Sequence, residues 1–151
     1  MYSNFLLLQF GFFGVSLSSQ LPSSGWKAAN FQKTCGSWYI MGPSANSIAA
    51  VCNSTISAPV WSSLDLGQCL WNDGGQLKPG NGGDFDESCS SCSLDRSAES
   101  PTKYECLCQK AGSPAMASPI DLGQVVGNWD GQLCCGEGDY ICGKTSQSPP
   151  M

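Results

Sequence analysis

A fourteen-residue segment occurs twice in this chain, and this internal repeat constrains the fold more than any other feature. Residues 64–77 (LDLGQCLWNDGGQL) and 120–133 (IDLGQVVGNWDGQL) are identical at eight of fourteen positions, at a constant offset of 56 residues. Cys52 and Cys108 precede the repeated aspartate by the same number of residues. A register kept over this length predicts two tandem copies of one structural unit.

The limits of the units follow from a second repeated segment. The sequence FQKTC at 31–35 is echoed by FDESC at 85–89, so the two units span 31–77 and 85–133. The Gly- and Asn-rich residues 78–84 join them. A unit of about fifty residues buries too little apolar surface to fold alone. We therefore expect the two units to share one core with pseudo-twofold symmetry.

Each unit has the residue pattern of β-structure. A first strand is expected to begin at Phe-x-x-x-Cys, and returning strands are expected over 47–52 and 103–108, after turns rich in Gly, Pro, Ser and Asn. In the repeated Asp-Leu-Gly-Gln sequence, the aspartate can cap one helical turn and the glutamine can reach back in a capping box. The Asn-x-x-Gly sequence then begins another strand. The residues of this turn are the caps Asp65 and Asp121, the glutamines Gln68 and Gln124, and an apolar face of Leu66, Cys69, Leu70, Leu122, Val125 and Val126.

The charged and titratable residues exclude several functions. Seven basic residues stand against twelve acidic ones, for a net charge of −5, so the chain is not expected to bind nucleic acid through its charge. Histidine is absent, which excludes Ser/His/Asp and Cys/His nucleophiles and His-containing zinc sites. Two carboxylates among Asp84, Asp86 and Glu87 could in principle cleave a glycoside, but a solvated rim explains this cluster better. We expect no enzyme activity.

The N-terminus and the ten cysteines both indicate secretion. No charged side chain precedes Lys27, and the apolar run 5–15 has the length of a signal-peptide core but is too short to span a bilayer. A core strand or an uncleaved membrane anchor are the alternatives for this run. Ten cysteines in a short chain indicate disulfides formed in an oxidising, extracellular compartment. The expected organisation is a signal peptide (1–19), one domain (30–135) and a C-terminal tail (136–151), whose Ser- and Pro-rich last part (144–151) is expected to have no order.

Four cysteines of the second unit fit a nested pair of disulfides. Opposed residues of an antiparallel hairpin have a nearly constant index sum, which favours Cys89 with Cys108 and Cys92 with Cys106 over the crossed pairing. A β-bulge between Cys89 and Cys92 is needed, since they would otherwise face opposite sides of the strand. The same four thiolates could instead hold zinc. An oxidising compartment argues against zinc, and we expect no metal.

The other six cysteines are less constrained. In the first unit, the disulfide equivalent by the repeat is expected to join Cys35 and Cys52. The last four allow more than one pairing. In one solution Cys69, on the buried turn, reaches Cys135 and leaves Cys134 for Cys142.

The chain resembles the cyanovirin-N homology family of small lectins. The resemblance lies in an ordered series of motifs that occurs twice: Phe-x-x-x-Cys, a later Cys, and Asp-Leu-x-x-x-hydrophobic-x-Asn-x-x-Gly-x-Leu. The extra cysteines resemble fungal secreted members. The resemblance covers 30–135 and implies an all-β, pseudo-twofold pair of sheet-plus-hairpin modules that exchange strands between the repeats. It also implies that the partners are mannose-type oligosaccharides or glycoproteins, with no cofactor, no catalysis and no membrane insertion. The chain is then expected to be a monomer or a domain-swapped dimer.

The resemblance also implies two sugar pockets. The second pocket departs from the family pattern, since Trp71 and Gly74 stand where the better-known member has acidic residues and Ala111 replaces an arginine. Trp129 either offers an apolar face to a sugar or covers the edge of the core. The first pocket corresponds to Asn30, Lys33, Thr34, Asn53, Thr55, Asn128, Trp129 and Asp130. The second corresponds to Trp71, Asn72, Gly74, Asp84, Glu87, Ser88, Gln109, Lys110 and Ala111.

One motif conflicts with sugar binding at the first pocket. Asn53-Ser54-Thr55 is an N-glycosylation sequon. A glycan on Asn53 would lie inside this pocket and block it, or would occupy a neighbouring molecule's site. The alternative function is a disulfide-rich extracellular structural or interaction protein that has kept the scaffold without sugar binding.

Overall fold

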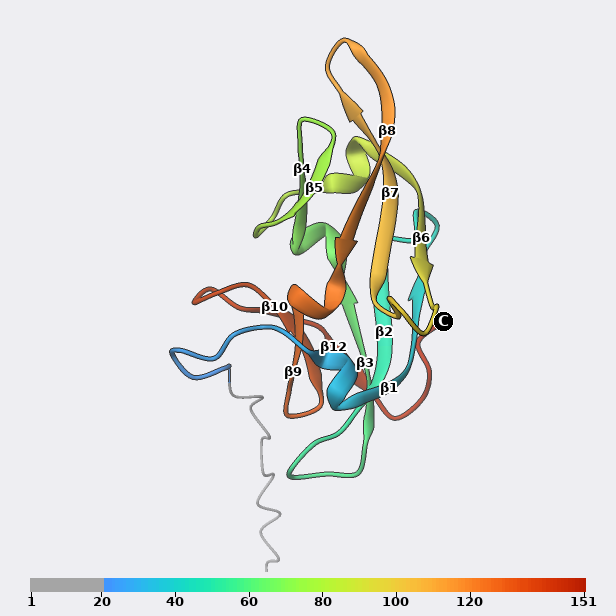
Figure 1. Ribbon diagram of the computed structural model, residues 1–151. Helices are drawn as coiled ribbons and strands as arrows, with labels where there is room; N and C mark the ends of the chain where they lie inside the picture. The colour runs from blue at the N-terminus through green and yellow to red at the C-terminus, as the bar shows by residue number, and fades with distance from the viewer. Residues whose placement is uncertain (1–20) are drawn as a thin grey trace, which may run out of the picture.

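The computed structural model describes residues 21–151, so the predicted signal peptide lies outside the described residues. Within this range the chain folds into β-strands and four single 3₁₀ turns (Figure 1). No helix among these residues is long and apolar enough to cross a membrane. The elements are η1 (Phe31–Lys33), β1 (Cys35–Met41), β2 (Ser47–Cys52), β3 (Val60–Asp65), η2 (Leu66–Gln68), β4 (Leu70–Asp73), β5 (Gln76–Pro79), η3 (Phe85–Glu87), β6 (Cys89–Asp95), β7 (Lys103–Lys110), β8 (Ser113–Asp121), η4 (Leu122–Gln124), β9 (Val126–Trp129), β10 (Gln132–Cys135), β11 (Ile141–Cys142) and β12 (Lys144–Ser146).

Each repeat forms an antiparallel three-stranded meander followed by a 3₁₀ turn and a β-hairpin. The meanders are β1-β2-β3 and β6-β7-β8, and the hairpins are β4-β5 and β9-β10. The returning strand predicted over 47–52 is confirmed as β2, and β7 begins at Lys103 as predicted but runs two residues past Cys108. The third strands, β3 and β8, were not predicted. The strand expected after Asn-x-x-Gly is confirmed as β5 and as β10, and each pairs across the turn with a strand that was not predicted, β4 or β9.

The hairpin of each repeat packs against the meander of the other repeat. The backbone N–H of Leu77 in β5 donates to Ser118 Oγ in β8 at 2.7 Å, and the N–H of Leu133 in β10 donates to Ser62 Oγ in β3 at 2.9 Å. Both serines are buried. The predicted exchange of strands between the repeats is therefore confirmed, in the form of exchanged hairpins.

The repeated aspartates cap the turns that lead into these hairpins. Asp65 Oδ1 accepts the N–H of Gly67 at 2.9 Å, and Asp121 Oδ1 accepts the N–H of Gly123 at 2.8 Å, which confirms the predicted caps. Gln124 Nε2 reaches back to the carboxylate of Asp121 at 3.2 Å rather than to a backbone N–H, so the contact differs from a capping box.

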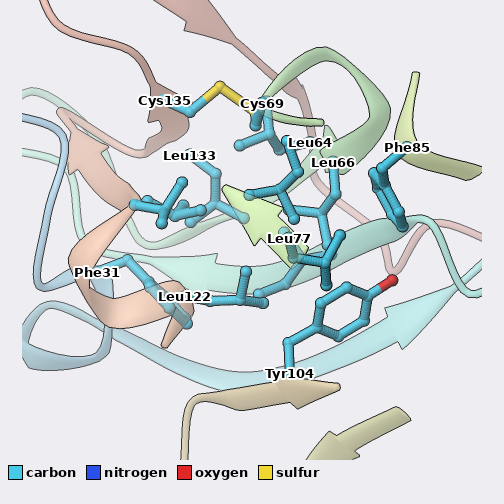
Figure 2. Close-up of a cluster of buried hydrophobic side chains, with 14 of the residues drawn as sticks. Phe31, Leu64, Leu66, Cys69, Leu77, Phe85, Tyr104, Leu122, Leu133 and Cys135 are labelled. Carbon is cyan, nitrogen blue, oxygen red and sulfur yellow. A yellow bond between two sulfur atoms is a disulfide. The ribbon is translucent and has the colours of Figure 1, made fainter. Parts of the chain in front are cut away.

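The two repeats share one core. Phe31 and Phe85, from equivalent turns, are both fully buried, as are Leu66 and Leu122 (Figure 2). The buried Tyr104 hydroxyl of the second repeat donates to the carbonyl of Ala45 in the first at 2.6 Å. Burial, and then the negative charge of Asp86, raise the pKa of this phenol, so it stays a protonated donor.

The five disulfides match the predicted pairs: Cys35–Cys52, Cys69–Cys135, Cys89–Cys108, Cys92–Cys106 and Cys134–Cys142. The four cysteines that could have held zinc are thus bonded to one another. The predicted bulge is present, since the β6–β7 register shifts between Ser90 and Ser93. The equivalent shift in β1 lies between Gly36 and Tyr39.

The C-terminal segment is more ordered than expected. The expectation of no order after residue 144 was wrong for β12, which pairs with β3 as the fourth strand of the first sheet. β11 pairs with β10, and the Cys134–Cys142 disulfide joins the same two strands. This crosslink holds the chain beside the open edge of β3, whose free backbone groups β12 then satisfies.

Candidate functional site

The first candidate site is built around Asn128, in β9 just before the turn to β10. Asn128 Nδ2 donates to Thr34 Oγ1 at 3.1 Å and to the carbonyl of Asn53 at 2.9 Å. Its Oδ1 accepts the N–H of Gly131 at 2.8 Å. Because the hairpins are exchanged, a side chain of the second repeat thus fixes two segments of the first. Both N–H groups of this amide are used inside the protein, which leaves a sugar at most one lone pair of its oxygen.

Asp130 organises the exposed side of the same turn. Its backbone has φ 45°, a left-handed conformation that aspartate tolerates better than most residues. Its Oδ1 accepts the N–H of Thr55 at 2.5 Å, the Thr55 hydroxyl at 2.9 Å and the Ser54 hydroxyl at 3.0 Å. The hydrogen bond from the Thr55 backbone, followed by that from its hydroxyl, lowers the pKa of Asp130. The carboxylate is ionised at neutral pH and exposed to solvent.

The remaining predicted residues of the first site border this network. Asn30, at φ 61°, forms a β-bridge with Gly127 and is exposed, as is Lys33. Trp129 is half-buried and packs edge-on against Trp26, with 5.4 Å between the ring centroids. Sequence reasoning missed Ser54, because the family pattern assigns no role to that position. Its place inside the sequon was the only signal.

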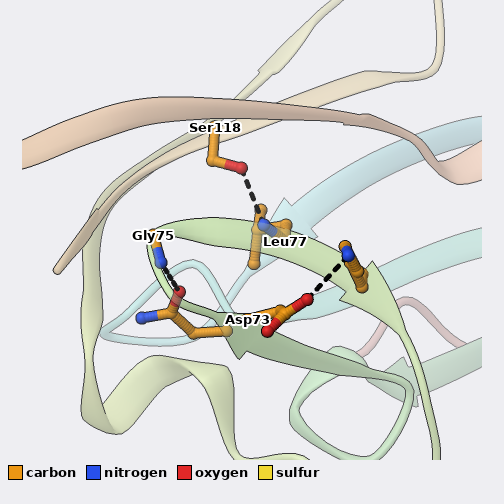
Figure 3. A network of polar contacts seen from close by, with 6 residues as sticks. Asp73, Gly75, Leu77 and Ser118 are labelled. Atoms are coloured by element: carbon orange, nitrogen blue, oxygen red, sulfur yellow. Dashed lines mark hydrogen bonds and ion pairs between the residues drawn. The ribbon is translucent and has the colours of Figure 1, made fainter. Parts of the chain in front are cut away.

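The second candidate site repeats this arrangement at Asn72, and we call Asn72 and Asn128 the clasps because each joins segments of the other repeat. Asn72 Nδ2 donates to Ser88 Oγ at 2.9 Å and to the carbonyl of Gln109 at 2.8 Å, and its Oδ1 accepts the N–H of Gly75 at 2.7 Å. In this hairpin Lys78 Nζ and Asp73 form an ion pair at 2.6 Å. Figure 3 shows the hairpin, with dashed lines for the contacts of Gly75 and Asp73 and for the Leu77–Ser118 bond. The two asparagines of the repeat therefore have the same structural role, which is to join the repeats.

The outer part of the second site differs from the first. Gly74, at φ 58°, occupies the position of Asp130, so no carboxylate is available there. Trp71 lies against the linker, because a Cβ added to Gly83 would lie 2.1 Å from the Trp71 Cβ. The exposed residues at this site are Trp71, Gly74, Asp84, Glu87, Gln109, Lys110 and Ala111, and Ser88 is half-buried.

Of the clustered acidic residues Asp84, Asp86 and Glu87, Asp86 is bonded to the first repeat. Asp86 Oδ2 accepts a hydrogen bond from Asn46 Nδ2 at 2.7 Å, which ties the second repeat to the first.

An open cavity of about 790 Å³ lies elsewhere, between Pro79, Gln124 and Glu137. It contains none of the predicted sugar-binding residues, so we do not assign the site there.

Comparison with known proteins gives a consistent result. The model of the CVNH domain family matches residues 31–134. The solution structure of CVNH from Gibberella zeae is 22% identical, with a TM-score of 0.61 over 70% of this chain and 96% of that one. Microvirin, solved with mannobiose, is 27% identical, with a TM-score of 0.61 over 72% and 99% of the two chains.

A variant of MoCVNH3 solved with (N-GlcNAc)4 is 18% identical, with a TM-score of 0.62 over 74% of this chain and all of that one. Structures this distant in sequence show that the fold is shared. A search of curated proteins found no match.

Proposed function

The chain belongs to the CVNH family, whose members include lectins solved with bound oligosaccharides, and from this premise we propose that it is a carbohydrate-binding protein. The first site is the proposed binding site. The proposed ligands are mannose-type oligosaccharides, free or on glycoproteins. Microvirin, which was solved with mannobiose, supports this choice as the relative of highest identity among the three compared.

The network at Asp130 is the observation that carries the proposal. Its Oδ1 is held by three hydrogen bonds from Ser54 and Thr55, while its Oδ2 accepts none from the described residues. A fixed carboxylate with a free oxygen accepts hydrogen bonds from adjacent sugar hydroxyls, and such charge-assisted bonds are among the strong ones. The exposed amide of Asn30 and ammonium of Lys33 supply donors nearby.

Binding without catalysis is proposed for the same site. Glycoside hydrolysis needs one carboxyl group with a raised pKa to protonate the leaving oxygen. Hydrogen bonds lower the pKa of Asp130, so it is an acceptor and not a proton donor at neutral pH.

Secretion and a monomeric or domain-swapped dimeric state are proposed as well. All ten cysteines form disulfides, which persist in an oxidising compartment. Shallow polar pockets bind a single sugar weakly, so one functional pocket per chain would make avidity depend on a dimer.

The test uses protein from the bacterial periplasm, where disulfides form. A glycan array identifies the ligand class, and calorimetric titration with mannobiose compares Asp130→Asn with Glu87→Gln, a matched change at the second site. Removing a charge-assisted hydrogen bond costs about 1.5–3 kcal/mol, so Asp130→Asn is expected to weaken binding roughly tenfold or more. Glu87→Gln is expected to change it less than about twofold. If no glycan binds even at high concentration, the proposal fails and the scaffold role without sugar binding is favoured.

A further inference from the structure

The one N-glycosylation sequon of the chain lies within the first site, and the proposed function does not use it. We propose that Asn53 carries an N-linked glycan, and that this glycan covers the first site so that occupancy of the sequon controls which site binds sugar. The claim that the glycan covers a sugar-binding site rests on the proposed function. The modification itself does not.

The side chain of Asn53 is available for modification. The residue is exposed and follows directly after β2, in the loop that leads to β3. Its backbone is held on both sides, since its N–H donates to the Thr34 carbonyl at 3.0 Å and its carbonyl accepts from Asn128. Its amide side chain makes no hydrogen bond with the described residues. The clasps Asn72 and Asn128, in contrast, use their side-chain amides fully as donors.

The transfer is a substitution at the first carbon of a donor sugar. The co-reactant is a lipid-linked oligosaccharyl pyrophosphate of the secretory pathway. The bond from its C1 to the phosphate oxygen breaks, with its electron pair staying on the lipid pyrophosphate, which leaves. A bond from C1 to Asn53 Nδ2 forms, and the amide gives one proton to water. No oxidant or reductant is required.

The contacts of Thr55 place this step before folding. The sequon is recognised through its third residue. In the folded protein the Thr55 N–H and hydroxyl are both bonded to Asp130, which lies 75 residues further along the chain. Thr55 is free of these contacts until Asp130 has been synthesised and β9-β10 has docked. Transfer during synthesis is therefore compatible with the final structure.

The glycan then affects only one of the two sites. Asn53 Nδ2 lies on the same residue whose carbonyl is bonded to Asn128, so the first sugar is attached at the edge of the network. At the second site the equivalent carbonyl belongs to Gln109, which is followed by Lys110 and Ala111 and forms no sequon. The glycosylated chain keeps only the second site uncovered, and that site lacks the carboxylate of Asp130.

The experiment begins with the full chain secreted from yeast. Intact mass measured without reduction, and a glycopeptide map, are expected to show a hexose-rich glycan on Asn53. Asn53→Gln is expected to lose the added mass, while Thr55→Ser, which keeps both the sequon and the hydroxyl, retains it. Secreted protein without a glycan on Asn53, or a chain that never enters the secretory pathway, would overturn the inference.

Binding is then compared on one unchanged sequence. Mannobiose is titrated into the yeast protein, the same protein trimmed to a single N-acetylglucosamine by endoglycosidase, and unmodified periplasmic protein. Affinity is expected to be at least tenfold lower for the untrimmed form than for the unmodified form. Equal affinities would overturn the covering role. If the glycan is present and none of the forms binds sugar, the proposed function and the covering role fail together, while the modification stands.

Discussion

The buried hydroxyls of Ser62 and Ser118 allow the hairpin exchange to be tested at two single residues. Each accepts the backbone N–H of a leucine on the hairpin of the other repeat, Leu133 for Ser62 and Leu77 for Ser118. The exposed fractions of the two serines are 1% and 4%, so water cannot replace the lost acceptor after substitution by alanine. An unsatisfied buried N–H costs about 1–3 kcal/mol. Because total stabilities are about 5–15 kcal/mol, either change is readily measured.

The assay is guanidinium unfolding with the disulfides intact. Ser62→Ala and Ser118→Ala are expected to lower the free energy of unfolding by similar amounts, since the two positions are equivalent in the repeat. Ser90→Ala, on the exposed face of β6, is the control and is expected to stay within about 0.5 kcal/mol of the parent. The reasoning is refuted if Ser62→Ala and Ser118→Ala behave like this control.

Three further changes test the contacts between the repeats and the first site. Replacing Cys69 and Cys135 together by alanine removes a disulfide with a sequence separation of 66, which should lower the free energy of unfolding by at most about 4 kcal/mol. Thermal or denaturant unfolding measures this loss, and an unchanged midpoint would contradict it. Tyr104→Phe removes the bond to the partly exposed Ala45 carbonyl and should cost about 1 kcal/mol in the same assay, whereas a gain in stability would argue against the contact. Asp130 has a lowered pKa, so its stabilising contacts should be complete above the ordinary value of 3.8 and be lost as the pH falls through the lowered one. The amide shift of Thr55 in NMR spectra reports this transition, and a midpoint above 3.8 would count against the network.

The fold was largely predictable because the repeat and the cysteines carry local information. The index sums of Cys89 with Cys108 and Cys92 with Cys106 gave the hairpin register and required the bulge that the structure contains. The third strands were missed for a physical reason. The central buried position of β3 is Ser62, whose hydroxyl serves a distant hairpin, so the usual apolar alternation is interrupted. In β8 the only buried residue is Ser118.

The candidate site was predictable in composition but not in its internal bonding. The family motif selected Asn128 and Asp130. The structure bonds Asn128 to Thr34 and Asn53, and Asp130 to Thr55. That Asn128 uses both donors as a clasp depends on the exchanged hairpin, which no local pattern reports. The sugar-binding roles of these residues stay a prediction.

The central claim is that each half of the structure is completed by the hairpin of the other repeat. Backbone amide NMR spectra of two separate fragments, residues 21–83 with Cys69→Ala and residues 84–151 with Cys135→Ala, test it most directly. Each fragment alone is expected to give the narrow amide dispersion of an unfolded chain, since its meander lacks the exchanged hairpin. A well-dispersed spectrum from either fragment, with the shifts of the intact protein, would contradict the claim.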